Sequence, residues 1–340
     1  MLLSKKLLLV DKNPYMFIFP FVTSGGRRQA FTDYYITMNG SGITAGSFPV
    51  SRVWFTPHYS RGKYLTVANE DNAIEVYVSG DAQTWTLAAT LQSLHAVQTV
   101  LADGVHYLFT NEGTVYSSAD GVTWSAVGTN PIGITSAQGS VTYKDNKFVA
   151  ATVSNYAAKV YVSTDGCATW SEALTPPNYA PQYGNVYADG VFSVDGGFIA
   201  MYHNGGTRPG TGTTVSGSTH QIYYSANGNV WETNPVLSIP SPNVPTRLAS
   251  NGRVAFFTST GYSGATGYMT RDGVNWTPFQ FPAYVWRNAN CSANNRYLCQ
   301  SGYENTDLTL ATIDISSGLT SMAVFNNISP IHRMSNDATW

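Results

Sequence analysis

The sequence predicts an all-β protein, a single seven-bladed β-propeller of four-stranded antiparallel blades that spans residues 1–340. The first observation is a short phrase ending in tryptophan, "YSSADGVTW" at 116–124, which recurs in five clear copies. The second is its spacing. Aligned on a Ser or Thr, the clear copies fall at 79, 118, 163, 225 and 270, and fainter copies add 37 and 312. A period of about 40–45 residues with a β composition is typical of propeller blades.

Each repeat unit also carries a turn upstream of the phrase, followed by aromatic or β-branched residues. Examples are "SRGKYLTV", "ADGVHYLF" and "KDNKFVA". A unit therefore consists of a strand, a tight turn, a strand, a variable loop, a strand, an Asp-containing turn and a last strand. Asp-Gly and Asn-Gly pairs supply the positive φ that short hairpins need. This order predicts a four-stranded antiparallel meander in every unit.

The phrase has a physical explanation as a turn that locks the outer hairpin of each blade. The carboxylate of Asp120 can accept backbone N–H bonds from the turn that follows it, and Ser118 can bond to the opposite side. Gly121 tolerates the backbone angles of the turn. Trp124 returns to the sheet and can pack between blades, where burying an indole contributes a few kcal/mol. The repetition is therefore interpreted as structural.

The phrase resembles the Asp-box, or bacterial neuraminidase repeat (BNR), of sialidases and many other β-propellers. The resemblance covers about eight residues in each of five copies. In that family these turns lie on the face opposite the substrate site, so their acids are expected to be structural. The matching positions are Ser79, Asp81, Trp85, Ser118, Asp120, Trp124, Ser163, Asp165, Trp170, Ser225, Asn227, Trp231, Thr270, Asp272 and Trp276. Asn227 and Asn39 replace the acid in their copies, and Ile43 replaces the tryptophan in the first.

Composition excludes several classes of protein. Only 11% of residues are charged, against about 25% in ordinary soluble proteins. The net charge of −2 lacks the basic face that nucleic-acid binding requires. No apolar run reaches the roughly 18 residues of a membrane-spanning helix, so no membrane insertion is expected. The start "MLLSKKLLLVDKNPY" is interpreted as mature sequence, because Asp11 and Pro14 replace a small-residue cleavage site.

Candidate binding residues lie in the loops opposite the Asp-containing turns. Two loops are aromatic: they carry Tyr179 and Tyr183 in "PPNYAPQYG", and Tyr284 and Trp286 in "FPAYVWRNA". Exposed aromatic side chains next to proline suit sugar stacking or a protein contact. Packing between blades would explain them equally well. The longest loop, 203–221, is rich in Gly and Thr and is expected to be a surface excursion or a subunit contact.

Arginines form a second candidate set. Arg52, Arg247 and Arg287 each stand near the start of a predicted innermost strand and would point toward the central channel. Sialidases bind a carboxylate with three arginines, but the chain lacks their Arg-Ile-Pro motif and a convincing Tyr–Glu nucleophile pair. The loop acids are scattered, whereas glycoside hydrolysis needs two carboxyl groups flanking one bond. No catalytic residue is assigned. The six His show no metal-ligand spacing and no cofactor motif occurs, so neither a metal nor a cofactor is expected.

The expected function is that of a non-enzymatic phage virion protein, a tail or fibre component that provides a rigid platform for docking or host attachment. It would be assembled in the host cytoplasm. Its expected partners are other virion proteins, with a homo-oligomer or a bacterial surface glycan as further options. The alternatives are a sialidase-like carbohydrate-active enzyme and an extracellular, lectin-like glycan-binding propeller. The fold cannot choose among them, because propellers serve both roles.

Two further expectations concern the last blade. Residues 330–337, in the C-terminal segment 330–340, are expected to supply the innermost strand of the closing blade, with Leu7–Val10 as the alternative. In "CSANNRYLC" a two-residue Asn-Asn turn would pair Ala293 with Arg296 and would place Cys291 opposite Leu298. The thiols of Cys291 and Cys299 would then point to opposite faces of the sheet, so three free thiols are expected.

Overall fold

The computed structural model describes the backbone of residues 15–18, 34–39, 42–47, 53–54, 58–70, 73–81, 84–92, 95–131, 140–154, 157–176, 185–207, 214–215, 219–240, 245–250, 252, 254–259, 266–280, 286–293, 296–301, 307–314 and 320–326. Side chains are described for most of these residues between 58 and 278. All regular elements in this part of the chain are β-strands, which confirms the all-β prediction.

The strands of the first three sheets are β1 (Tyr15–Ile18), β2 (Tyr34–Asn39), β3 (Gly42–Ser47), β4 (Val53–Trp54), β5 (His58–Ser60), β6 (Lys63–Asn69), β7 (Ile74–Ser79), β8 (Thr86–Leu91), β9 (Ala96–Ala102), β10 (Val105–Thr110), β11 (Thr114–Ser118) and β12 (Ser125–Thr129). The next two sheets contain β13 (Ser140–Lys144), β14 (Lys147–Ser154), β15 (Ala157–Ser163), β16 (Ser171–Leu174), β17 (Asn185–Val194), β18 (Gly197–Thr207), β19 (Thr214–Val215), β20 (Thr219–Ser225) and β21 (Leu237–Pro240). The last two contain β22 (Pro245–Ser250), β23 (Ala255–Ser259), β24 (Thr266–Thr270), β25 (Thr277–Gln280), β26 (Trp286–Ala293), β27 (Arg296–Ser301), β28 (Asp307–Asp314) and β29 (Thr320–Asn326).

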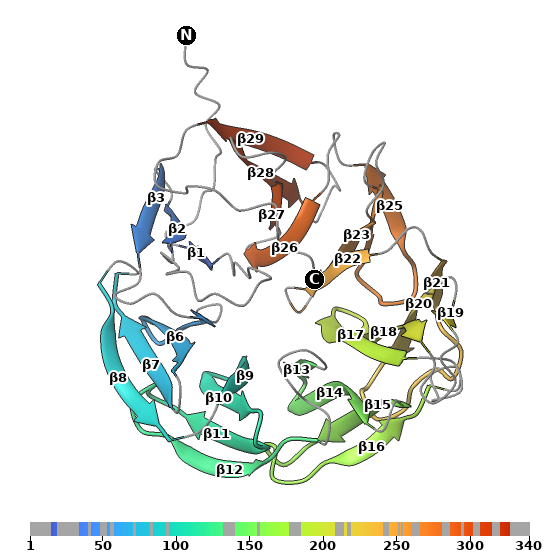
Figure 1. Cartoon of the computed structure of the whole chain (residues 1–340), viewed down its shortest axis with the longest axis horizontal. Helices are drawn as coiled ribbons and strands as arrows, with labels where there is room; N and C mark the ends of the chain where they lie inside the picture. Colours follow the sequence, from blue (N-terminus) through green and yellow to red (C-terminus); the bar gives the residue numbers. More distant parts are fainter. Residues whose placement is uncertain are drawn as a thin grey trace.

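The described strands form seven antiparallel sheets, and each repeat unit of the sequence corresponds to one of them. Figure 1 shows the sheets following one another in a ring around a central opening, with the first strands innermost. Four sheets have the predicted four strands. Two have five: β4 and β5 both pair with β6, and the short β19 pairs with β18. In the first sheet the described residues supply three strands.

The repeated turn, meaning the Ser/Thr-x-Asp/Asn turn of each phrase, joins the third main strand to the outer strand. In the copy at 118, Ser118 Oγ donates to Asp120 Oδ1 at 3.0 Å. The backbone N–H groups of Val122 and Thr123 donate to the same Oδ1, each at 2.8 Å. Asn227 does the same with its amide oxygen, which accepts two backbone N–H groups, each at 2.9 Å. An amide oxygen can therefore replace the carboxylate here, because the turn needs an acceptor rather than a charge.

The repeated turns also pack against the preceding sheet. Gly121 has φ +78°, and a Cβ there would lie 2.6 Å from Leu65 Cδ1 of β6. Both the backbone conformation and the close approach favour glycine at this position. Trp170 donates its ring N–H to the backbone oxygen of Thr129, in the outer strand of the preceding sheet, at 2.8 Å. Trp231 is buried, and its ring N–H bonds to Gly228 O inside its own turn at 2.8 Å. The turns therefore contribute to the interface between neighbouring sheets.

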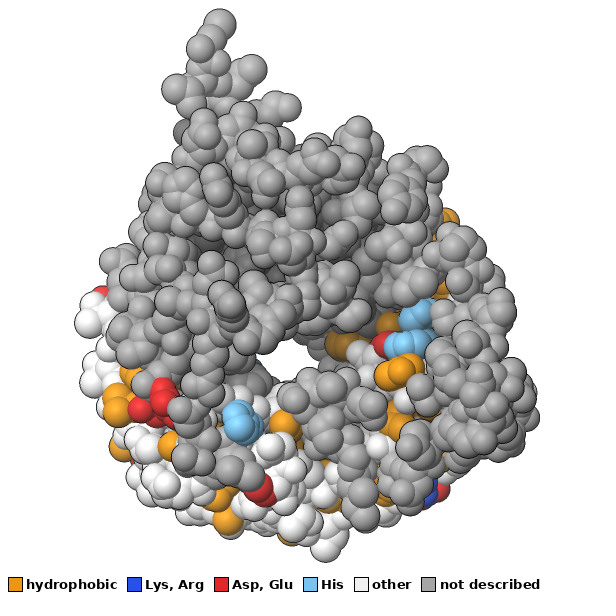
Figure 2. All heavy atoms as spheres, viewed as in Figure 1, with side chains coloured by type: hydrophobic (Ala, Val, Ile, Leu, Met, Phe, Trp, Pro, Cys, Tyr) orange, Lys and Arg blue, Asp and Glu red, His pale blue; other side chains and the backbone are white. Residues whose placement is uncertain are grey.

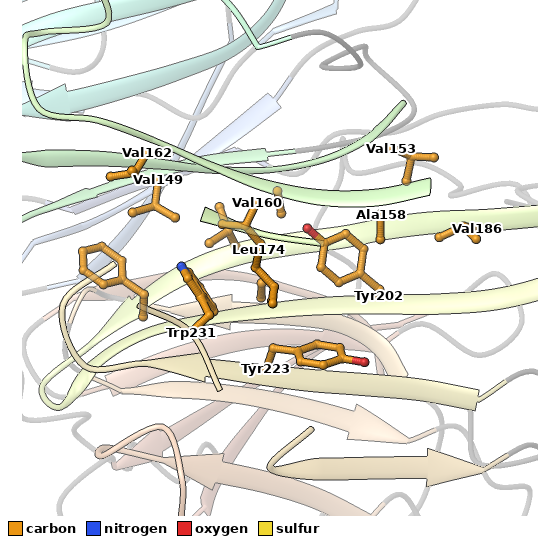
Figure 3. Close-up of a cluster of buried hydrophobic side chains, with 14 residues drawn as sticks. Val149, Val153, Ala158, Val160, Val162, Leu174, Val186, Tyr202, Tyr223 and Trp231 are labelled. Carbon is orange, nitrogen blue, oxygen red and sulfur yellow. The ribbon is translucent and has the colours of Figure 1, made fainter. Parts of the chain in front are cut away.

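Apolar layers between adjacent sheets form the core. Figure 3 shows one of them, in which Val149 and Val160 of one sheet face Tyr202, Tyr223 and Trp231 of the next. The two tyrosines are fully buried. Alternate residues of each strand point to opposite faces, so a sheet with neighbours on both sides is apolar on both faces. This explains the near-continuous apolar runs of the second strands, such as β6, whose burial spans five consecutive residues.

Two side-chain amides on the inner strands each form a pair of hydrogen bonds with the backbone of the neighbouring sheet. Gln98 of β9 donates to Val141 O at 2.6 Å and accepts from Val141 N at 2.7 Å. Asn69 makes the same pair with Ala96 one sheet earlier, at 3.0 and 2.7 Å. These paired bonds link the backbones of adjacent sheets.

The register predicted for the last sheet is confirmed. Ala293 pairs with Arg296, Ser292 with Tyr297 and Cys291 with Leu298. The two segments considered for the closing strand, 330–337 and 7–10, lie outside the described residues.

Candidate functional site

The structure describes only some of the binding residues that the sequence predicts. Arg247 lies in β22, and Trp286 and Arg287 begin β26, each the first strand of its sheet. Arg52, Tyr179, Tyr183 and Tyr284 lie outside the described residues. The turns of the five clear copies form internal hydrogen bonds through their Asp or Asn side chain, and residues 82–83 of the first of these turns lie outside the described residues.

Sequence reasoning missed a cluster of three side chains in the fifth sheet: Asp189 of β17, His203 of β18 and His220 of β20. His203 and His220 stand directly opposite each other on adjacent strands. Asp189 occupies a β-bulge, because Ala188 pairs with Tyr202 and Gly190 with Met201, so that Asp189 has no partner of its own. A bulge redirects the side chain of the extra residue. Here it brings a carboxylate to the histidine pair.

Hydrogen bonds hold the cluster together. His203 Nδ1 lies 2.7 Å from Asp189 Oδ1, and His220 Nδ1 lies 3.2 Å from Asp189 Oδ2. The two imidazole rings stack with centroids 4.6 Å apart, and Tyr187 stacks on the other side of His203 at 4.7 Å. One carboxylate therefore contacts both histidines, and the ring of His203 lies between two aromatic neighbours.

The three side chains of the cluster are buried to different degrees. The side chain of His220 is 4% exposed, that of Asp189 20% and that of His203 25%. Burial raises the pKa of Asp189, but hydrogen bonds from His203 and His220 outweigh it, so the pKa lies below its usual range. The carboxylate is therefore ionised near neutral pH. His220 Nε2 is buried and has no hydrogen-bond partner.

The cluster lies between the apolar core and the loop side of the sheet. Met201 and Ile222 lie two residues from His203 and His220 along their strands, and both belong to the apolar layer on that face. The cluster is the polar end of this layer, beside the long segment that leaves β18 at Thr207 and returns at Thr219. Figure 2 shows His side chains gathered in two places near the central opening, one of them beside an acidic side chain.

A second histidine pair, His58 and His106, has a different character. Their rings stack at 6.1 Å between the second and third sheets. Burial, and then the charge of His106, lower the pKa of His58 to about 4. Burial, and then Arg61, lower the pKa of His106. Among the described residues no carboxylate contacts this pair, which is interpreted as a neutral part of the core.

The sequence held one signal for the Asp189 cluster. His203 and His220 lie at the two ends of segment 203–221, which the sequence predicts as a loop, whereas the structure extends β18 to Thr207 and begins β20 at Thr219, so both histidines belong to paired strands. For the bulge at Asp189 the local signal was Gly190, because a glycine inside a strand often marks a bulge. The part of the chain that the structure describes contains no helix long and apolar enough to cross a membrane.

Comparison with known proteins supports the propeller fold. A family model described as "DUF6242 beta propeller domain" matches residues 58–190. No curated protein matches the chain. A solved protein from Lactobacillus plantarum is similar at 15% identity with a TM-score of 0.56, over 92% of this chain and 95% of that one. YCF48 from Cyanidioschyzon merolae is similar at 13% identity and TM-score 0.52, over 81% and 86%. A putative 6-phosphogluconolactonase from Bacteroides fragilis is similar at 10% and 0.55, over 92% and 94%.

At these identities the likeness concerns the fold alone. Together with the ring of antiparallel sheets, it identifies the chain as a β-propeller. The similar structures include proteins as different as YCF48 and a putative 6-phosphogluconolactonase, so the fold leaves the activity open.

Proposed function

We propose that the chain is a non-enzymatic docking platform, a seven-bladed propeller with Asp-box turns that serves as a tail or fibre component of a phage virion. Its proposed partners are other virion proteins, including further copies of the chain, and a glycan of the bacterial surface.

The blade number and the Asp-box assignment have separate support. The described residues form seven sheets, one for each repeat unit of the sequence. All five clear copies of the phrase use an Asp or Asn oxygen to bind the backbone of the same turn. Such conserved geometry within one chain is what the Asp-box assignment requires.

The docking role depends on one observation: the polar groups of the repeated turns are used inside the molecule. The carboxylate of Asp120 accepts from two backbone N–H groups and from Ser118. That of Asp165 accepts from the backbone N–H and the hydroxyl of Thr169 and from Ser163. These hydrogen bonds lower the pKa of each of the two acids to about 2. A carboxyl group with such a pKa is a poor general acid or base near neutral pH. The turn face therefore suits a scaffold, and recognition falls to the variable loops.

The setting in a virion follows from composition, since few charges and abundant Ser, Thr, Gly and Tyr suit a protein that functions outside the cell. A similar propeller, YCF48, has been solved "bound to D1 peptide". That likeness, at 13% identity, extends to the fold only, and it illustrates that a propeller of this shape can dock a partner chain.

The test uses particles banded on a density gradient from lysed host cells. We expect the protein in the particle band at a fixed copy number, with immunogold label at one end of the particle. A Fab against segment 208–218 should reduce adsorption to host cells, whereas a Fab against the turn at 119–123 should not. Finding the protein only in the soluble lysate would exclude a virion role. Release of sugars from host envelope glycans by the purified protein would favour the carbohydrate-active alternative.

A further inference from the structure

We propose that Asp189, His203 and His220 form a binding site for one divalent transition-metal ion of the zinc class, with one ring nitrogen from each histidine and one carboxylate oxygen as ligands. This inference is independent of the docking role and of the virion setting.

The donor set carries the first part of the argument. Neutral imidazole is the commonest protein ligand for zinc, and two imidazoles with one carboxylate also suit iron, cobalt and copper. The ligand atoms of the three residues all lie within 4.8 Å of one another. Among the residues that the structure describes, this is the one group of three or more His, Cys, Asp or Glu side chains with that property. Three protein ligands with an open position is the arrangement of many functional zinc sites.

The distances are close to those that an ion would impose. Bond lengths of about 2.0–2.1 Å in a tetrahedron place neighbouring ligand atoms about 3.3 Å apart. In the cluster, His203 Nδ1 lies 2.7 Å from Asp189 Oδ1, and His220 Nδ1 lies 3.2 Å from the other carboxylate oxygen, Oδ2. Exchanging the shared protons for an ion therefore requires the cluster to open by a few tenths of an ångström on one side. Coordination also requires the rings to turn out of their stack; the side chain of His203 is a quarter exposed, whereas that of His220 is buried.

One buried polar atom of the cluster has no hydrogen-bond partner. His220 is 96% buried by side-chain area, yet its Nε2 has no partner. A buried polar atom without a hydrogen bond costs about 1–3 kcal/mol, so native proteins rarely retain one without a reason. An ion held through Nε2 of His220, after its ring has turned, would satisfy this atom and would neutralise the charge of the Asp189 carboxylate.

The backbone places the ligands on a rigid frame. All three come from adjacent strands of one sheet, and His203 and His220 are direct cross-strand partners. Directly opposed residues have Cβ atoms about 4.5–5.5 Å apart, so little chain entropy is lost when they share an ion. In the sequence the two histidines lie on either side of segment 208–218, so the ion would link β18 and β20, the strands that precede and follow it.

The experiment uses the full chain without a histidine tag, stripped with a chelator and then titrated with Zn²⁺ by isothermal calorimetry. We expect one ion per chain and a higher melting temperature in the presence of Zn²⁺. Substituting Co²⁺ should give visible d–d absorption. His203→Ala, His220→Ala and Asp189→Asn should each lower the affinity by more than about tenfold, since even residues that only orient ligands have effects of 10–100-fold.

The matched control is His95→Ala, which removes an exposed histidine elsewhere and should leave binding unchanged. Melting curves in chelator show whether each variant folds; should His220→Ala fail to fold, His203→Gln tests the site from its exposed side. The proposal is overturned when wild-type protein binds no ion at millimolar Zn²⁺, or when the three variants bind Zn²⁺ as the wild type does.

Discussion

The two hydrogen bonds between the Gln98 amide and the backbone of Val141 should be among the strongest single contributions to the stability of the interface between the third and fourth sheets. Gln98→Ala removes the acceptor of Val141 N–H and the donor to Val141 O, which lie 2.7 and 2.6 Å away. Val141 is 3% exposed, so both of its backbone groups lose their partner in a buried position. Each such loss costs about 1–3 kcal/mol. Because Gln98 is half-buried, water can partly replace it, and we expect a total of about 2–4 kcal/mol.

The expected change in melting temperature follows from the size of the chain. An unfolding entropy of about 2.1 cal/mol/K per residue gives roughly 0.7 kcal/mol/K for 340 residues. The loss therefore corresponds to a fall of about 3–6 °C, measurable by calorimetry. Asn69→Ala should behave similarly, since its amide makes the same two bonds with Ala96. Gln98→Glu keeps the volume and one acceptor but places a carboxylate oxygen against Val141 O, so it should also destabilise.

The control is Thr86→Ala on the exposed outer strand β8, where a change within about 0.5 kcal/mol is expected. Equal melting temperatures of the Gln98→Ala and Thr86→Ala variants would refute the reasoning. A Gln98→Glu variant with the melting temperature of the wild type would refute it as well. Either result would mean that the apolar layers alone set the position of adjacent sheets.

Three further outcomes are expected. Backbone N–H bonds from Thr123 and Val122 lower the pKa of Asp120 to about 2, so its contribution to stability is complete above the unfolded value near 4 and is lost as pH falls toward 2; carboxyl NMR titration measures this, and a midpoint near 4 would contradict it. Gly128→Ala should strongly destabilise or prevent folding, because its Cβ would lie 1.9 Å from Cys167 O; a soluble variant with unchanged melting would show that the two outer hairpins can separate. Burial raises the pKa of the Cys167 thiol, so it should react with a thiol reagent only after denaturation, when three free thiols per chain are expected; a count of one would indicate a disulfide between the other two cysteines.

Local chemistry explains how much of the fold the sequence could predict. The repeated turn needs a Ser or Thr, an Asp or Asn two residues later, and the backbone N–H groups of the next few residues. All of these lie close together in the sequence, so the hydrogen bonds of the turn are encoded locally. The same holds for the pairing of Ala293 with Arg296, which a two-residue turn determines. Together with the repeat period of about 40–45 residues, these short-range rules were sufficient to predict the β-propeller class and the antiparallel four-stranded sheets.

The Asp189 cluster shows what only the tertiary structure decided. His203 and His220 are separated by a long loop whose length gives no register, and Asp189 reaches them through a bulge that replaces regular pairing. Likewise, nothing near Gln98 in the sequence indicates that its amide binds Val141 in the next sheet. The sequence by itself determined the repeat, the turn chemistry and the class of fold. The tertiary structure decided which polar side chains meet, because the repeat period gives the order of the sheets but not the alignment of individual side chains across loops of different length.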